Sequence, residues 1–122
     1  MYLITKTFKF EAAHRLEDWP IGHQCNRLHG HSYQFTITLI GDILSGPPKP
    51  GVILDYGDLS TIVIEEIVFK WDHEYLNEVL NERNVTAEFL AKKIHDILRP
   101  YLPIIHSVEV KETATSSAVY IP

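Results

Sequence analysis

The sequence predicts an α+β fold in which two helices lie between the second and third strands of a four-stranded antiparallel sheet. Residues 2–12 and 29–40 alternate apolar and polar side chains, as half-buried strands do. Residues 56–69, and the stretch from Thr86 to Pro100, instead repeat apolar side chains at helical spacing. Strand-like runs at 106–112 and 117–121 complete the order strand, strand, helix, helix, strand, strand, and such segregated helices are typical of the α+β class.

The first strand is predicted to carry a histidine on its apolar face. Alternation places Ile4, Phe8, Phe10 and Ala12 on one face of this strand. If the strand continues two residues further, His14 lies on the same face. A histidine in that phase is either buried or part of a site.

The second strand begins with two histidines, His29 and His31, separated only by Gly30. In an extended segment both imidazoles point to the same face, and they are in phase with the apolar residues Tyr33, Phe35, Ile37 and Leu39. The connection from the first strand is short, which favours an antiparallel pair. This pairing brings His14 close to His29 and His31.

Three neutral imidazoles around an open position form a common catalytic zinc arrangement. Cys25, the only cysteine, comes just before the histidine pair and could be a fourth ligand, or a thiolate base or nucleophile beside the metal. The plainer alternatives are a surface His-Gly-His loop and a cysteine that serves as a small buried apolar residue. The phase of the flanking strands favours a site.

The two predicted helices have recognisable start and stop signals. Asp55 reads as the N-cap of the first helix, with Asp58 at its third position and an end near Phe69. Thr86 caps the second helix, and Pro100 prevents its continuation. The segment between the helices, 70–85, is predicted to be in part a loop.

Two further polar features are candidates for a site. Asp72 precedes His73 in the predicted loop, where an aspartate can raise the basicity of the imidazole and fix its tautomer, although a solvated loop pair is the simpler interpretation. Glu112 falls on the apolar phase of the third long strand, where an ionised carboxylate is costly unless it is paired. Glu112 is therefore either a carboxylate that receives N–H donors from a ligand or the frayed end of a strand.

The bulk properties restrict the class of protein. The 122 residues fit one domain, 1–122, and a net charge of −5 argues against general nucleic-acid binding. One cysteine, with no predicted secretory signal and no apolar run long enough for a bilayer, predicts a cytoplasmic protein that does not bind a membrane. Four strands with one helical layer leave sheet edges open, so we expect oligomerisation.

Several ordered motifs resemble those of the 6-pyruvoyltetrahydropterin synthase and 6-carboxytetrahydropterin synthase family. The similarity extends from Phe8 to Tyr120, and the spacing of the cysteine motif, preceded by Gly22-His23-Gln24, looks like the 6-carboxytetrahydropterin synthases of the queuosine pathway. The motifs are Phe10-Glu11-Ala12-Ala13-His14-Arg15-Leu16, Cys25-Asn26-Arg27-Leu28-His29-Gly30-His31-Ser32, Leu54-Asp55-Tyr56, Asp72-His73-Glu74-Tyr75-Leu76-Asn77, Thr86-Ala87-Glu88 and Lys111-Glu112-Thr113.

The resemblance implies the tunnelling fold, in which the sheets of several protomers join into a barrel, usually in a hexamer built as a dimer of trimers with active sites between subunits. It implies Zn²⁺ on His14, His29 and His31 and a catalytic role for Cys25 as the base. It also implies that Asp72 and His73 form a relay that could act on a neighbouring subunit, and that Glu112 anchors the pterin. Substrate contacts are implied at Thr86 and Ala87.

The implied activity is that of a zinc-dependent lyase. It converts 7,8-dihydroneopterin triphosphate to 6-carboxy-5,6,7,8-tetrahydropterin and releases acetaldehyde and triphosphate. A 6-pyruvoyltetrahydropterin synthase or another pterin-processing member of the family is the alternative within the resemblance. A zinc hydrolase and a non-catalytic zinc-binding oligomer are the more remote alternatives, and the hydrolase would leave the cysteine without a role.

Overall fold

The computed structural model describes residues 1–122 and contains a five-stranded sheet in the order β3-β1-β2-β4-β5. The four long strands are antiparallel to their neighbours, as predicted; their bounds are Tyr2–His14 (β1), His29–Gly41 (β2), Ile105–Thr113 (β4) and Ser116–Tyr120 (β5). The fifth, β3 (Glu74–Tyr75), pairs in parallel with Ala12 and Ala13 at the edge of the sheet. The sheet is therefore mixed rather than purely antiparallel.

The pairing of β1 with β2 fixes the position of the histidines. Phe8 is opposite Phe35 in the register, and the last pair at this end of the ladder is His14 with His29. The first strand thus continues to His14, and the predicted antiparallel register is confirmed. Because facing residues in such a ladder share one side of the sheet, the two imidazoles point the same way.

The first helical run is longer than predicted and contains a π-helix. It consists of α1 (Tyr56–Val63), the π-helix η2 (Ile64–Val68) and α2 (Phe69–Trp71). The buried residues recur every fourth position, at Leu59, Val63, Ile67 and Trp71. A regular α-helix turns about 40° too far at each step of four residues, so the wider π turn keeps Ile67 and Trp71 facing the core.

Two shorter segments and a second long helix complete the fold. Helix α4 (Ala87–Leu98) begins at Thr86, whose hydroxyl accepts a hydrogen bond from the Phe89 N–H at 3.1 Å, as the capping prediction requires. The 3₁₀ turn η1 (Gln24–Asn26) lies in the loop between β1 and β2. Helix α3 (Leu76–Val79) and β3 occupy the segment predicted to be in part a loop. Two residues of strand pairing leave no periodic signal in a sequence.

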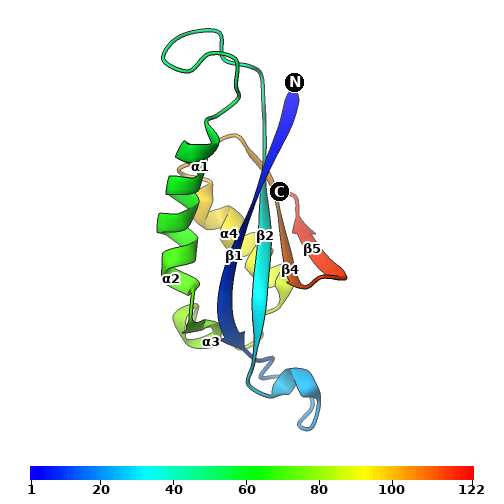
Figure 1. Ribbon diagram of the computed structural model, residues 1–122. Coiled ribbons are helices and arrows are strands. Elements are labelled where there is room, and N and C mark those ends of the chain that lie inside the picture. The colour runs from blue at the N-terminus through cyan, green and yellow to red at the C-terminus, as the bar shows by residue number, and fades with distance from the viewer.

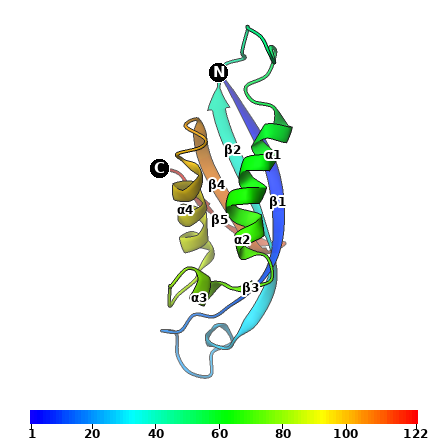
Figure 2. The ribbon, with the colours of Figure 1, turned by 90° about the vertical axis from the view of Figure 1, so that its left-hand side faces the viewer.

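The helices cover one face of the sheet, and the core lies between the two layers (Figures 1 and 2). The Phe10 ring links the layers, because it stacks on Tyr33 at 5.0 Å and meets Trp71 edge-on at 5.7 Å. The alternate residues of β1, including Thr7 and Lys9, are exposed on the opposite face. No helix is long and apolar enough to cross a membrane.

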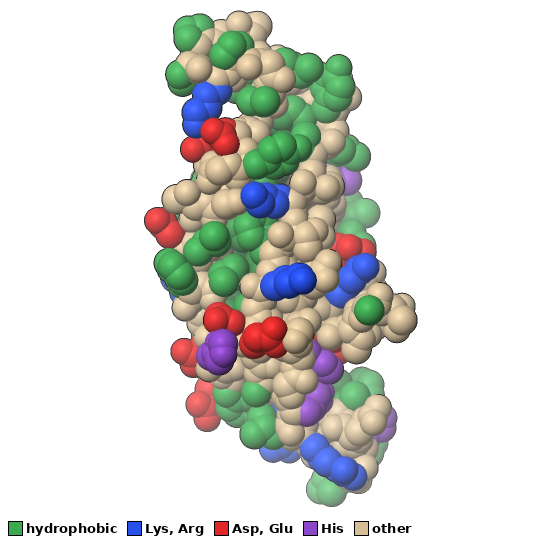
Figure 3. All heavy atoms as spheres, in the orientation of Figure 1, with side chains coloured by type: hydrophobic (Ala, Val, Ile, Leu, Met, Phe, Trp, Pro, Cys, Tyr) green, Lys and Arg blue, Asp and Glu red, His purple; other side chains and the backbone are tan.

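Two long loops extend beyond opposite ends of the sheet. The connection from β2 to α1 extends beyond one end of the sheet, and the loop from β1 to β2 extends beyond the other (Figure 1). Histidine side chains reach the surface in the lower part of the molecule, near the second loop (Figure 3). The candidate site is at this lower end.

Candidate active site

His14, His29 and His31 form a cluster in which one ligand atom from each residue lies within 4.8 Å of the others. They meet because β1 ends and β2 begins at the same end of the ladder, with all three side chains on the face that the helices cover. His14 is only 2% exposed, while His29 and His31 are half-buried. The predicted convergence of the three histidines is confirmed.

Backbone carbonyls fix the tautomers of two of these imidazoles. His14 Nδ1 lies 2.7 Å from the Val85 carbonyl oxygen, and His29 Nδ1 lies 2.6 Å from that of Arg27. Because a carbonyl oxygen only accepts, both Nδ1 atoms donate, and the lone pair of each neutral ring is on Nε2. Carbonyl acceptors of this kind commonly orient histidines that bind a metal.

The Nε2 atoms of the three histidines have too few hydrogen-bond donors around them. The Nε2 atoms of His14 and His29 are 3.0 Å apart, and Nε2 of His31 is buried without a hydrogen-bond partner. Lone pairs at this separation repel unless a cation or a proton lies between them, and an orphaned buried polar atom is costly. A metal ion bound by the three Nε2 atoms satisfies all of them, so the residues fit a metal centre with an open position.

Burial keeps two of the histidines in the form that binds metal. The pKa of His14 is lowered to about 4, mainly by burial; the hydrogen bond to Val85 opposes the shift, and the charges of His29 and His31 contribute to it. Burial and then His29 also lower the pKa of His31. Neutral imidazoles are therefore favoured at neutral pH, and no proton has to be displaced from them for a metal to bind.

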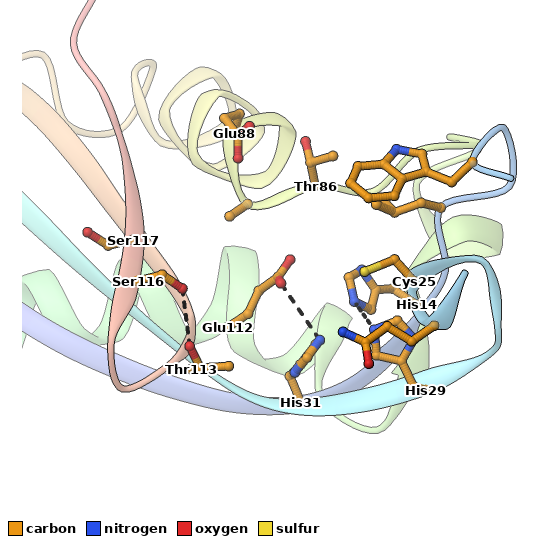
Figure 4. A pocket seen from close by; sticks show the side chains of 14 residues that line it. His14, Cys25, His29, His31, Thr86, Glu88, Glu112, Thr113, Ser116 and Ser117 are labelled. Carbon is orange, nitrogen blue, oxygen red and sulfur yellow. Dashed lines mark hydrogen bonds and ion pairs between the residues drawn. The ribbon is translucent and has the colours of Figure 1, made fainter. Parts of the chain in front are cut away.

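The histidines form one end of a cavity of about 600 Å³ (Figure 4). Its wall is assembled from the loop after β1, the start of β2, the N-terminus of α4 and the β4–β5 hairpin. The lining residues are His14, Leu16, Trp19, Gln24, Cys25, His29, His31, Thr86, Ala87, Glu88, Glu112, Thr113, Ser116 and Ser117. A cavity of this volume suits a small molecule.

Cys25 reaches the cavity from the 3₁₀ turn η1, and in Figure 4 its sulfur is on the side of the cavity where the histidines lie. The cysteine is a half-buried free thiol. A thiol that is partly exposed beside a metal position can lose its proton and act as a base, whereas a thiol sealed in the core could not. The interpretation of Cys25 as a buried apolar residue is therefore wrong.

Glu112 projects from β4 toward His31, as Figure 4 shows, with Oε2 3.7 Å from Nε2 of His31. This separation is too long for a hydrogen bond. Burial raises the pKa of the Glu112 carboxyl, the Glu88 carboxylate across the cavity raises it further, and His29 lowers it. The carboxylate is half-buried and without a donor from the chain, so it can accept donors from a ligand.

Thr86 and Ala87 line the cavity at the first turn of α4. The Thr86 hydroxyl accepts the Phe89 N–H in the helix cap, which leaves its O–H free to donate to a ligand. The N–H groups of the first helical turn have no partner within the helix and are the groups that a bound molecule can use.

Asp72 and His73 form the predicted pair, but they do not line the histidine cavity of the same chain. His73 Nδ1 lies 2.9 Å from Asp72 Oδ2, and Asp72 Oδ1 accepts the Glu11 N–H at 2.8 Å. The Glu11 N–H and then His73 lower the pKa of the Asp72 carboxyl. His73 has φ = 61°, an uncommon conformation for a histidine, and such outliers concentrate at functional positions.

Of the pair, His73 lines a shallow depression of about 550 Å³ at β3, together with Glu11, His31 and Ser32. The Ser32 hydroxyl donates to the Glu11 carboxylate at 2.6 Å. Both residues alternate with the buried histidines along β1 and β2, so this depression is on the opposite face of the sheet.

Residues 3–122 match the family model described as 6-pyruvoyl tetrahydropterin synthase. The chain belongs to this family. It is 37% identical to a 6-carboxy-5,6,7,8-tetrahydropterin synthase of Synechocystis, over 98% of this chain and 93% of the relative. It is 29% identical to the human 6-pyruvoyl tetrahydrobiopterin synthase, over 96% of this chain and 89% of the human protein.

Solved structures of the family share the fold. The Caenorhabditis elegans 6-pyruvoyl tetrahydropterin synthase superimposes with a TM-score of 0.84 at 23% identity, over 99% of this chain and 95% of that chain. A Plasmodium falciparum 6-pyruvoyl tetrahydropterin synthase superimposes with a TM-score of 0.71 at 16% identity, over 97% and 96% of the two chains. The predicted tunnelling-fold topology of the protomer is thereby confirmed.

Several residues of the cavity were not predicted from the sequence. Glu88 was named only within the motif Thr86-Ala87-Glu88, although it faces Glu112 across the cavity in Figure 4. Ser116 and Ser117 follow Glu112 by one hairpin, so their proximity to the carboxylate could have been inferred from the turn. No pattern in the sequence distinguishes Trp19 from an ordinary exposed loop residue.

Proposed function

We propose that the protein is a zinc-dependent 6-carboxytetrahydropterin synthase that acts on 7,8-dihydroneopterin triphosphate, with residues 1–122 forming a single pterin synthase domain. The observation that carries the proposal is the cavity that contains the three histidines, Cys25 and the unpaired carboxylate of Glu112 together. Relatives that bear the name of this activity, matched over nearly the whole chain, support it. The products are 6-carboxy-5,6,7,8-tetrahydropterin, acetaldehyde and triphosphate, which places the protein in the queuosine pathway.

His14, His29 and His31 hold the zinc through Nε2, because two of their Nδ1 atoms are already used by carbonyl acceptors. When bound, Zn²⁺ supplies a Lewis acid that acidifies hydroxyl groups and stabilises negative charge. The histidines contribute orientation and a neutral donor set. The open side of the cluster faces the cavity, where the substrate side chain can approach.

Cys25 acts as the base that removes a proton from the substrate side chain. Cys25 lies on the wall of the same cavity as the histidines, and Zn²⁺ bound by them would favour its thiolate form. The carboxylate of Glu112 holds the pterin by accepting hydrogen bonds from its 2-amino group and its ring N–H. These two donors lie in one plane and match the two carboxylate oxygens. The cavity between Cys25 and Glu112 then determines which end of the substrate reaches the base.

Asp72 and His73 complete the site of a neighbouring copy and move a proton there. Neither residue lines the histidine cavity of the same chain, and His73 lies beside the edge strand β3, which supports action on a neighbouring copy. The resemblance implies a hexamer, and the exposed sheet edges are compatible with the joining of sheets into a barrel. We place the assembled enzyme in the cytoplasm.

Production of 6-pyruvoyltetrahydropterin is the second candidate function, because the human relative bears the name of that synthase. Product identification tests the two candidates. The zinc-loaded protein is incubated with 7,8-dihydroneopterin triphosphate, and the pterins and acetaldehyde are identified by mass spectrometry. The 6-carboxy product with an equal amount of acetaldehyde supports the proposal; a 6-pyruvoyl product, or an unchanged substrate, contradicts it.

A further inference from the structure

We propose that His23 is a positioning residue that holds Cys25 at the cavity by accepting the backbone N–H of the cysteine. The inference rests on the proposed function, in which the Cys25 thiolate is the base. Nothing in that mechanism requires His23, which lies outside the histidine cluster. The role is therefore additional to the site already described.

The backbone of Cys25 is held from both sides. Its N–H donates to Nδ1 of His23 at 3.0 Å, and its carbonyl oxygen accepts the Leu16 N–H at 2.8 Å. His23 is the N-cap of the turn η1, with the extended backbone angles φ = −70° and ψ = 138°. With both backbone groups used, the direction in which the Cys25 side chain leaves the turn is fixed.

The His23 ring is itself held in place. Its partner is an N–H donor, so Nδ1 of His23 carries the lone pair and the ring proton is on Nε2. The ring packs edge-on against Trp19 with 4.9 Å between centroids, and Trp19 lines the cavity. The Trp19 carbonyl oxygen accepts from the buried Asn26 side chain at 2.9 Å, which ties both ends of this loop together.

These contacts predict what happens when the His23 acceptor is removed. The loop keeps the Leu16 and Asn26 hydrogen bonds, so the chain should fold and the zinc ligands should stay in place. Only the start of the turn η1 becomes more mobile. As a result, the Cys25 side chain is no longer held in one orientation. His23→Ala should therefore impair the use of Cys25 and leave the metal site intact.

The test compares His23→Ala with His23→Asn and with the control His106→Ala, which changes a histidine outside the cavity. Asparagine at an N-cap accepts from the N–H two residues later, so it can replace the Nδ1 acceptor but cannot exchange protons as an imidazole does. We expect kcat to fall about five- to tenfold in His23→Ala, the scale of one lost hydrogen bond, with KM and zinc content unchanged. His23→Asn should restore most of kcat.

A second readout needs no substrate. Cys25 is the only cysteine, so alkylation by iodoacetamide reports on this thiol alone. Zinc loading should raise the alkylation rate in the wild-type protein and in His23→Asn, because a nearby dication favours the thiolate, and should have no effect in His23→Ala. Since this assay uses no pterin, it tests the positioning of Cys25 even if turnover of the pterin is never found.

Three results would overturn the inference. An unchanged kcat in His23→Ala would show that the hydrogen bond does not position the base. Equal losses in the Ala and Asn variants would assign the role to the imidazole itself rather than to its acceptor atom. A zinc response of the alkylation rate in His23→Ala equal to that of the wild-type protein would show that the thiol stays at the metal without His23.

Discussion

The two faces of the sheet at the lower end of β1 and β2 carry different halves of the proposed chemistry. On the face that the helices cover, His14 is 2% exposed and lies in a deep cavity with the other two histidines. On the opposite face, the exposed His73 lines a shallow depression and is hydrogen-bonded to Asp72. Glu11 and Ser32 of this depression alternate with the buried histidines along β1 and β2, which separates the two groups.

Within one chain, three histidines that could hold a metal come together, while Asp72 and His73 lie outside their cavity. On the covered face, burial and a carbonyl acceptor both act on His14, so its ring is neutral and oriented. The exposed face supplies an aspartate–histidine pair that water can reach.

The largest effect is expected from His14→Ala. Removal of one of three ligands should abolish zinc binding at micromolar metal, and activity should be lost with the metal. Zinc content is measured by mass spectrometry of the purified protein, with His73→Ala on the opposite face as the matched control. Full zinc occupancy in His14→Ala would rule out the three-histidine centre.

Mixing two inactive variants tests whether the Asp72–His73 pair acts on the histidine cavity of a neighbouring copy. Cys25→Ala should keep its zinc and lose roughly 10²–10⁴-fold in turnover, the scale of a general base, and His73→Ala should also be severely impaired. If the pair acts on a neighbouring copy, mixed oligomers should recover about a quarter of the wild-type sites by random association. No recovery after confirmed subunit exchange would contradict an active site shared between copies.

Glu112→Gln should weaken the binding of pterin and leave the metal alone. The substitution keeps the size of the side chain but replaces one acceptor oxygen with an NH₂ group that opposes the donors of the pterin. The binding free energy should fall by about 1.5–3 kcal/mol, the scale of a hydrogen bond to a charged group. Fluorescence titration of the zinc-loaded variant measures this loss, and an unchanged affinity would remove Glu112 from the pterin site.

The last effect concerns the stability of the metal-free protein. The pKa of His14 is about 4 in the folded chain, whereas an unfolded histidine titrates near 6.5, so the unfolded state binds more protons between these values. Stability is thus fully present above about pH 6.5 and falls as the pH decreases toward 4, by on the order of 2–3 kcal/mol. Urea unfolding across this range should show a weaker pH dependence for His14→Gln, and parallel curves for the two proteins would contradict the shift.

Much of the fold follows from local patterns in the sequence. The alternation along the strands and the capping signals of Asp55 and Thr86 depend only on residues nearby in the sequence. The pairing of His14 with His29 follows from that alternation and from the short connection between the two strands. The β3 pairing and the π-helix depend on tertiary packing, which a sequence pattern does not record. The position of Asp72 relative to the histidines also depends on tertiary packing. It is determined by the face of the sheet on which the segment before β3 lies.

The central claim is that three imidazole nitrogens bind zinc while Cys25 stays free to act as a base, and X-ray absorption at the zinc edge tests it most directly. We predict about one zinc per chain with nitrogen ligands at about 2.0–2.1 Å and no sulfur in the first coordination shell. The spectrum should be the same in Cys25→Ala. A sulfur ligand at about 2.3 Å that disappears in Cys25→Ala would make the cysteine a ligand rather than a base and would contradict the account.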